Sequence, residues 1–165
     1  GEASVRSRLI SEEDMVKQAS EFAGTVPVRH LLPYWKTSNR YLFSGGSVNM
    51  RDAAVYAKEE NWSKAVELWK QTYETKKGKQ KMYAAYNTAL GYEMQDSIDT
   101  ALEWALKAQT LAREKSKTDK KETGEIHNGT ISYYIFISMY VDELEKRKEG
   151  MARLNMQMNR FDDDF

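Results

Sequence analysis

A pattern of apolar residues that appears twice at a fixed distance is the feature that most constrains the fold of this chain. Tyr56 and Ala65 return as Tyr92 and Ala101, since 92 − 56 and 101 − 65 both give 36. A period of this length is typical of stacked helical repeats, in which each helix pair buries its apolar face only against the next pair. The repeat predicts a helical array, and it makes binding a better expectation than catalysis.

The composition supports a single all-helical domain spanning residues 1–165. The chain is 30% charged and contains only 2 Pro and 9 Gly, which favours helices over a turn-rich β fold. Its 25 basic residues balance 25 acidic ones, so the net charge is zero. A protein without a global positive field has no general attraction for nucleic acid, and we expect none as a partner.

Turn signals divide the domain into an N-terminal segment, a repeat region, a C-terminal helix and a tail. We expect the N-terminal segment to form helices beginning after Ser11 and at Pro33, and to lie over the repeats as a lid. Asp119 with Glu122 three residues later predicts the start of the C-terminal helix, and the Asn128-Gly129 pair is an alternative boundary. The expected ranges are 1–46 for the helical lid, 47–113 for two helix pairs, 119–158 for a long capping helix and 159–165 for an acidic tail.

Small and aromatic residues at matching positions make the two helix pairs resemble the tetratricopeptide repeat (TPR). The resemblance covers residues 46–113 and implies a right-handed α–α superhelix. Both units lack the early Trp and the closing Pro of that family. Because two units are fewer than the roughly three that a stable array needs, we expect the lid and the C-terminal helix to cap them. The matching residues are Ala53, Tyr56, Trp62, Ala65 and Trp69 in the first unit and Ala89, Tyr92, Ile98, Ala101 and Ala108 in the second.

A second resemblance concerns location. Pro33-Tyr34-Trp35 and Arg40-Tyr41 ahead of the repeats, with a Leu/Met-striped helix after them, resemble the helical part of uncharacterised cell-envelope lipoproteins of Bacteroidetes. This implies a periplasmic or outer-membrane location and a lipid anchor upstream of the chain. No apolar run approaches the roughly 20 residues that cross a bilayer, so we expect no transmembrane segment.

The TPR resemblance also implies a binding groove, because the first helices of such units line a concave face. This groove would be rich in aromatic and methionine side chains, which suits a peptide or a partner helix held by apolar anchors. Asn87 matches a position that grips a peptide carboxylate in some TPR proteins, but Met50 and Ala54 replace the other clamp residues. The alternative is that the N-terminal lid fills the groove. The predicted partner-binding residues are Met50, Arg51, Ala54, Lys58, Tyr83, Tyr86, Asn87, Leu90, Glu93 and Met94.

Residues with catalytic or metal-binding chemistry are few. His30 and His127 stand apart from any acid or nucleophile signature, and the chain has no cysteine. The run Asp162 to Asp164 lacks the alternating ligands and turn glycine of a calcium loop. We therefore expect no catalytic residue, no metal and no cofactor.

Three functions remain open at this point. The leading interpretation is a TPR-like interaction or scaffold module that binds a protein or peptide. The first alternative is an assembly subunit that self-associates through the apolar stripe of the C-terminal helix, from Leu144 to Met158. The second alternative is an enzyme or sugar-binding subunit that uses the aromatic surface.

Overall fold

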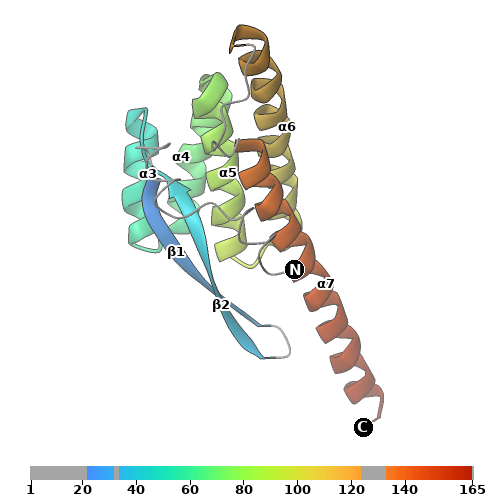
Figure 1. Cartoon of the computed structure of the whole chain (residues 1–165). Coiled ribbons are helices and arrows are strands. Elements are labelled where there is room, and N and C mark those ends of the chain that lie inside the picture. The colour runs from blue at the N-terminus through green and yellow to red at the C-terminus, as the bar shows by residue number, and fades with distance from the viewer. Residues whose placement is uncertain (1–21, 32–33, 124–132, 165) are drawn as a thin grey trace.

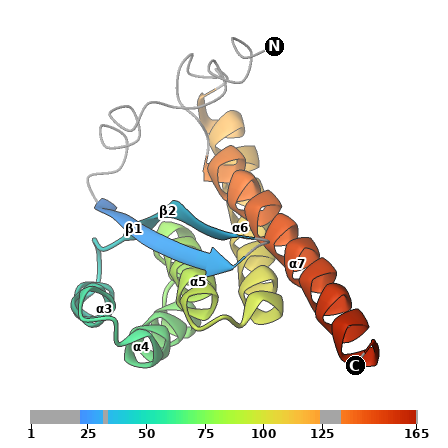
Figure 2. The same ribbon diagram turned by 90° about the horizontal axis from the view of Figure 1, so that it is seen from below.

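The computed structural model describes residues 22–31, 34–123 and 133–164. Within these ranges a β-hairpin lies across one side of a row of helices (Figures 1 and 2). Helices that follow one another in the chain pack side by side, and the second strand contacts α3 and α5. The elements are β1 (Phe22–Leu31), β2 (Trp35–Phe43), α3 (Val48–Lys58), α4 (Trp62–Thr75), α5 (Gly78–Met94), α6 (Ile98–Thr123) and α7 (Tyr133–Asp163).

The region predicted to repeat is helical, and the turns after α3 and α5 have the same backbone conformation. Glu60 and Asp96, which are 36 positions apart, both have φ values near +60° (60° and 59°). The next residue donates to a carbonyl five positions back in both turns, from Asn61 to Tyr56 at 2.8 Å and from Ser97 to Tyr92 at 2.9 Å. The two turns therefore end their first helices in the same way.

The small residues predicted at the close helix contacts are all in the core. Ala53, Ala65, Ala89 and Ala101 are completely buried. Gly91 on α5 adds another close approach, because a Cβ atom at this position would overlap the side chains that α4 presents to it. The predicted core aromatic Trp69 is also fully buried. The helices of this region can therefore pack closely because the residues at their contacts have small side chains or none.

The prediction of a helical N-terminal lid is wrong for the described residues, which form the hairpin. Proline at position 33 suggested the first turn of a helix containing Trp35 and Phe43, but β2 runs through both residues. The signal overlooked was an alternation with period two. Val28 and Arg40 face the helices and are buried, whereas the residues beside them in each strand are exposed or only partly buried. The helix expected after Ser11 lies largely outside the described residues.

The helix boundaries near the C-terminus also differ from the expectation. Helix α6 continues to Thr123 because residues 113–123 contain neither glycine nor proline, and Gly124 follows. Asp119 and Glu122 thus lie within α6 and do not begin a new helix. Helix α7 begins at Tyr133, closer to the alternative boundary, and it includes residues expected in the tail up to Asp163. None of the described helices has the length and apolar character needed to cross a bilayer.

Candidate functional site

Strand β2 occupies the face of the helices that was predicted to form the binding groove. The Phe43 ring is completely buried and stacks on Tyr83, with a centroid distance of 4.1 Å and an interplanar angle of 11°. It also meets Tyr86 edge-on at 5.2 Å. The end of β2 is therefore anchored by an aromatic cluster that belongs to α5. The alternative in which the N-terminal segment fills the groove describes this arrangement, although as a strand and not as a helix.

Asn87 holds the backbone of the same strand residue. Its Nδ2 donates to the Phe43 carbonyl oxygen at 2.6 Å, and the Phe43 N–H donates to Asn87 Oδ1 at 3.1 Å. Both bonds are buried, and one side-chain amide thus satisfies both polar groups of a strand residue. Asn87, which matched a peptide-binding position of TPR proteins, thus binds the backbone of its own chain.

Further along the groove, the carboxylate of Glu93 joins α5, β2 and α7. Arg40 donates to both of its oxygens, from Nε at 2.9 Å and from Nη2 at 3.2 Å. Arg147 Nη1 donates to Oε2 at 2.8 Å, and the Tyr140 hydroxyl donates to Oε1 at 3.0 Å. The Glu93 side chain is completely buried, and both arginine side chains are 6% exposed. Burial disfavours the carboxylate, but the hydrogen bonds and charges of Arg40 and Arg147 outweigh burial and lower the pKa of Glu93.

His30 lies at the edge of this ionic cluster. It is 4% exposed, and its Nδ1 has no hydrogen-bond partner in the described part of the chain. Burial lowers the pKa of His30 and the charges of Arg147 and Arg40 lower it further, which outweighs the opposing effects of Glu93 and of the Val28 backbone. The imidazole is therefore favoured in its neutral form in the fold.

The structure divides the predicted partner-binding residues into two groups. Six of them belong to the core beneath β2 and do not lie on an open surface: Met50, Tyr83, Tyr86, Asn87, Leu90 and Glu93. Replacement of Tyr86 is consequently expected to destabilise the fold, and it is not a clean test of binding. The other four remain accessible. Arg51 and Lys58 are exposed, and Ala54 and Met94 are half-buried.

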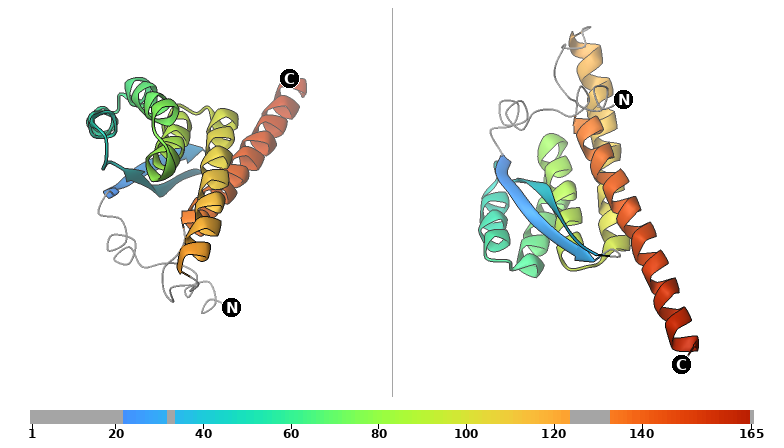
Figure 3. Two further views of the ribbon diagram at one scale, coloured as in Figure 1. Left: turned by 90° about the horizontal axis from the view of Figure 1, so that it is seen from above. Right: turned by 60° about the horizontal axis from the view of Figure 1, so that its bottom comes forward.

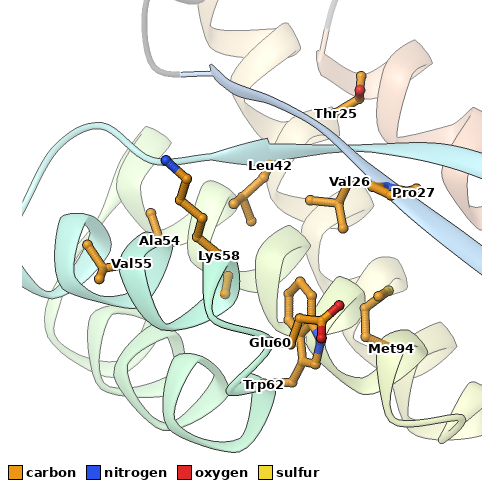
Figure 4. A pocket seen from close by; sticks show the side chains of 11 residues that line it. Thr25, Val26, Pro27, Leu42, Ala54, Val55, Lys58, Glu60, Trp62 and Met94 are labelled. Carbon is orange, nitrogen blue, oxygen red and sulfur yellow. The ribbon is translucent and has the colours of Figure 1, made fainter.

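Three of these accessible residues line a pocket of about 430 Å³ between the hairpin and α3 (Figure 4). Ala54 and Lys58 contribute from α3, and Met94 contributes from the end of α5. Figure 4 shows Val26 and Leu42 of the hairpin directed toward the same space. The remaining lining residues are Thr25, Pro27, Val55, Ala57, Glu60 and Trp62.

The chemistry of the pocket suits binding through apolar contacts. Its wall is formed mainly by aliphatic and aromatic side chains, and the charged groups that line it are the exposed Lys58 and Glu60. The described residues contain no cluster of His, Cys, Asp or Glu that could hold a metal ion. Glu93 is engaged by two arginines and a tyrosine, so its carboxylate is a structural acceptor. His127 lies outside the described residues.

Residues 51–146 match the family described as a domain of unknown function, DUF6340. The chain belongs to the DUF6340 family. The match begins within α3 and ends within α7, so it includes Asn87 and Glu93 but not Arg40 and Phe43. A second family of unknown function, DUF8603, matches residues 1–43. Neither the curated proteins nor the solved structures gave a match to the chain.

The region that matches DUF8603 ends just before the loop between β2 and α3, and the region that matches DUF6340 begins just after it. Residues from both regions pack in the same core. Phe43, the last residue of the DUF8603 match, is fully buried against α5 of the DUF6340 region. Arg40 likewise forms its ion pair with Glu93 across this boundary. The helices of the DUF6340 region are thus completed by a strand from the segment before them.

Sequence reasoning missed the ionic cluster, although one signal for it was present. Arg147 stands at a position of the α7 stripe that is otherwise apolar, and a buried cation at such a position requires an anion. Glu93 provides that anion from α5. Its second partner, Arg40, could not be found without the hairpin, because the strand register brings its side chain to the inner face.

Proposed function

We propose that this protein is a non-catalytic interaction module that binds an apolar segment of a partner protein in the pocket between the hairpin and α3. The helices α3 to α6 serve as two TPR-like units that form the scaffold. The observation that carries this proposal is the pocket of about 430 Å³, whose volume lies within the range of small-ligand and side-chain sites.

The TPR-like interpretation is supported by the repeated turns and by the buried alanines. Glu60 and Asp96 have the same backbone conformation, and Ala65 and Ala101 occupy equivalent buried positions in the second helices. In a TPR array, the first helices carry the ligand. Here α3 contributes Ala54 and Lys58 to the pocket, in agreement with that role.

The way in which strand β2 binds to the helices suggests the kind of ligand. Strand β2 is an extended segment whose Phe43 ring is buried among aromatic residues and whose backbone is bonded by Asn87. A partner segment would use the same mode of apolar anchoring beside Leu42. Lys58 and Glu60 at the pocket provide one charge of each sign for polar groups that flank the anchor.

Peptide selection followed by a matched pair of variants tests this proposal. Peptides selected from a random library on the wild-type protein should share one large apolar residue. Ala54→Trp fills the pocket and should weaken their binding at least tenfold. Asp52→Trp is the control, because Asp52 is exposed, does not line the pocket and lies about 160° from Ala54 around α3. Equal binding by wild type and Ala54→Trp would refute the pocket as the site.

A second proposal, self-association through the C-terminal helix, is favoured by the exposed apolar residues at the end of α7, Met156, Met158 and Phe161. The cell-envelope location and the upstream lipid anchor stay predictions from the lipoprotein resemblance.

A further inference from the structure

The apolar stripe on α7 continues past the point where the helix leaves the body. In its first half the stripe packs on the rest of the protein, with Ile137 and Leu144 completely buried and Arg147 5% exposed. After Gly150 the same steps of three and four residues lead to Met151, Leu154, Met158 and Phe161. Met151 and Leu154 are half-buried, Met158 is 58% exposed and Phe161 is 70% exposed. Figure 3 shows this end of α7 projecting beyond the other helices.

We propose that the projecting half of α7 pairs with the same segment of a second copy in antiparallel orientation. Charge selects this partner and this direction. Between residues 146 and 153 the exposed Lys146, Lys148 and Arg153 outnumber the one acid, Glu149, and between residues 160 and 164 the three aspartates outnumber Arg160, so the first part is basic and the end is acidic. A parallel pair would place the aspartates of the two copies together. An antiparallel pair places the acidic end of each helix beside the basic part of the other.

The spacing of the stripe fixes the register of the pair. Along the stripe, the next apolar residue comes alternately three and four positions later. In an antiparallel pair, a residue that precedes a four-position step, such as Leu154, lies opposite a residue that precedes a three-position step, such as Met158. The layers are then Leu154 with Met158 of the second copy, and Met151 with Phe161 of the second copy. In this register Lys148 faces Asp162 of the second copy. Lys148 is accessible for that contact, because its side chain is 56% exposed although its Nζ lies 2.9 Å from Asp99.

The short length of the pair makes it a weak dimer. Residues 148–163 span about 24 Å at about 1.5 Å per residue, and an interface of that size belongs to the weak, concentration-dependent class. Self-association is therefore expected at high protein concentration and not as an obligate state. It is independent of the pocket, so loss of one interaction does not affect the other.

Sedimentation velocity of the full chain over a wide concentration range tests whether the protein self-associates through the projecting half of α7. Leu154→Glu should raise the dissociation constant at least tenfold, since it places a carboxylate in the central layer. Met156→Glu is the matched control, because Met156 is 59% exposed and lies off the stripe. Circular dichroism checks that both variants keep their helices. A protein that stays monomeric at every concentration, or one for which the two variants behave alike, would overturn the proposal.

Disulfide crosslinking tests the orientation, and the chain has no cysteine of its own to interfere. Leu154→Cys, made with a tag, and Met158→Cys, made without one, are mixed and oxidised. Antiparallel pairing predicts disulfides mainly between the two different variants, because only residues in one layer approach within bonding distance. The control mixture joins Arg153→Cys with Met156→Cys. Crosslinks formed mainly within each variant, or no more than in the control mixture, would contradict the antiparallel arrangement.

Discussion

Replacing Glu93 with glutamine should strongly destabilise the protein, although the new side chain has the same shape. The substitution keeps the volume of residue 93 but removes the buried negative charge to which Arg40 and Arg147 both bind. Arg40 would then lose the acid that it binds, and Arg147 would keep only the exposed Asp96, whose Oδ1 lies 3.6 Å from its Nη2, while both arginine side chains stay 6% exposed. They can neither lose their protons nor reach water without moving the strand or α7.

The magnitude follows from the burial of the pair. Removing one partner of a buried ion pair costs about 3–5 kcal/mol, because the other charge is left uncompensated. Glu93 has two such partners, of which Arg147 keeps a longer ion pair to the exposed Asp96, so a loss within this range is expected. Urea unfolding followed by circular dichroism measures the free energy directly, and the slope of the transition shows whether the native state has loosened.

Two controls make the result decisive. Glu103→Gln removes the same charge from an exposed position of α6 and should change the unfolding free energy by less than about 0.5 kcal/mol. Combining Glu93→Gln with Arg147→Met should recover part of the loss, because one stranded cation is removed. A loss below about 1 kcal/mol for Glu93→Gln alone would refute the assignment of this cluster as the link between hairpin and helices.

Three further predictions concern pH and packing. His30 has a folded pKa below its ordinary 6.5 because of burial and the charges of Arg147 and Arg40, so the unfolded chain binds its proton more readily. The unfolding free energy should therefore fall as the pH is lowered from about 7.5 to about 5.5, and His30→Leu should flatten this slope in urea titrations. Trp69→Ala should cost about 3–5 kcal/mol in the same assay, because it empties a fully buried site. Gly91→Ala should cost about 1–3 kcal/mol, because the added methyl group meets side chains of α4, and an unchanged midpoint would contradict this packing.

The repeat region shows what the sequence could predict. The period of 36 located both helix pairs and their turns, because the residues that set the period are the buried ones. Ala65 and Ala101 sit where helices approach closely, and such positions tolerate few other residues. The core and the helix order were therefore readable from local pattern alone.

The hairpin shows where the local pattern was too weak to decide between helix and strand. Its residues include Pro27 and Arg40, which weaken a strand pattern when each strand is considered alone. The strand becomes stable because Arg40 meets Glu93 and Phe43 meets Asn87, and both contacts join positions more than 40 residues apart. Long-range contacts of this kind override local preference. The same contacts turned a predicted open groove into core.

Hydrogen exchange of β2 tests the central claim, that the chain closes its own groove, most directly. The Phe43 amide donates to Asn87 Oδ1, and this bond is buried. We expect the Phe43 amide to exchange as slowly as the amides of α5, and Asn87→Ala to speed its exchange while the centre of α6 stays protected. Rapid exchange of the Phe43 amide in the wild-type protein, with α5 still protected, would contradict it.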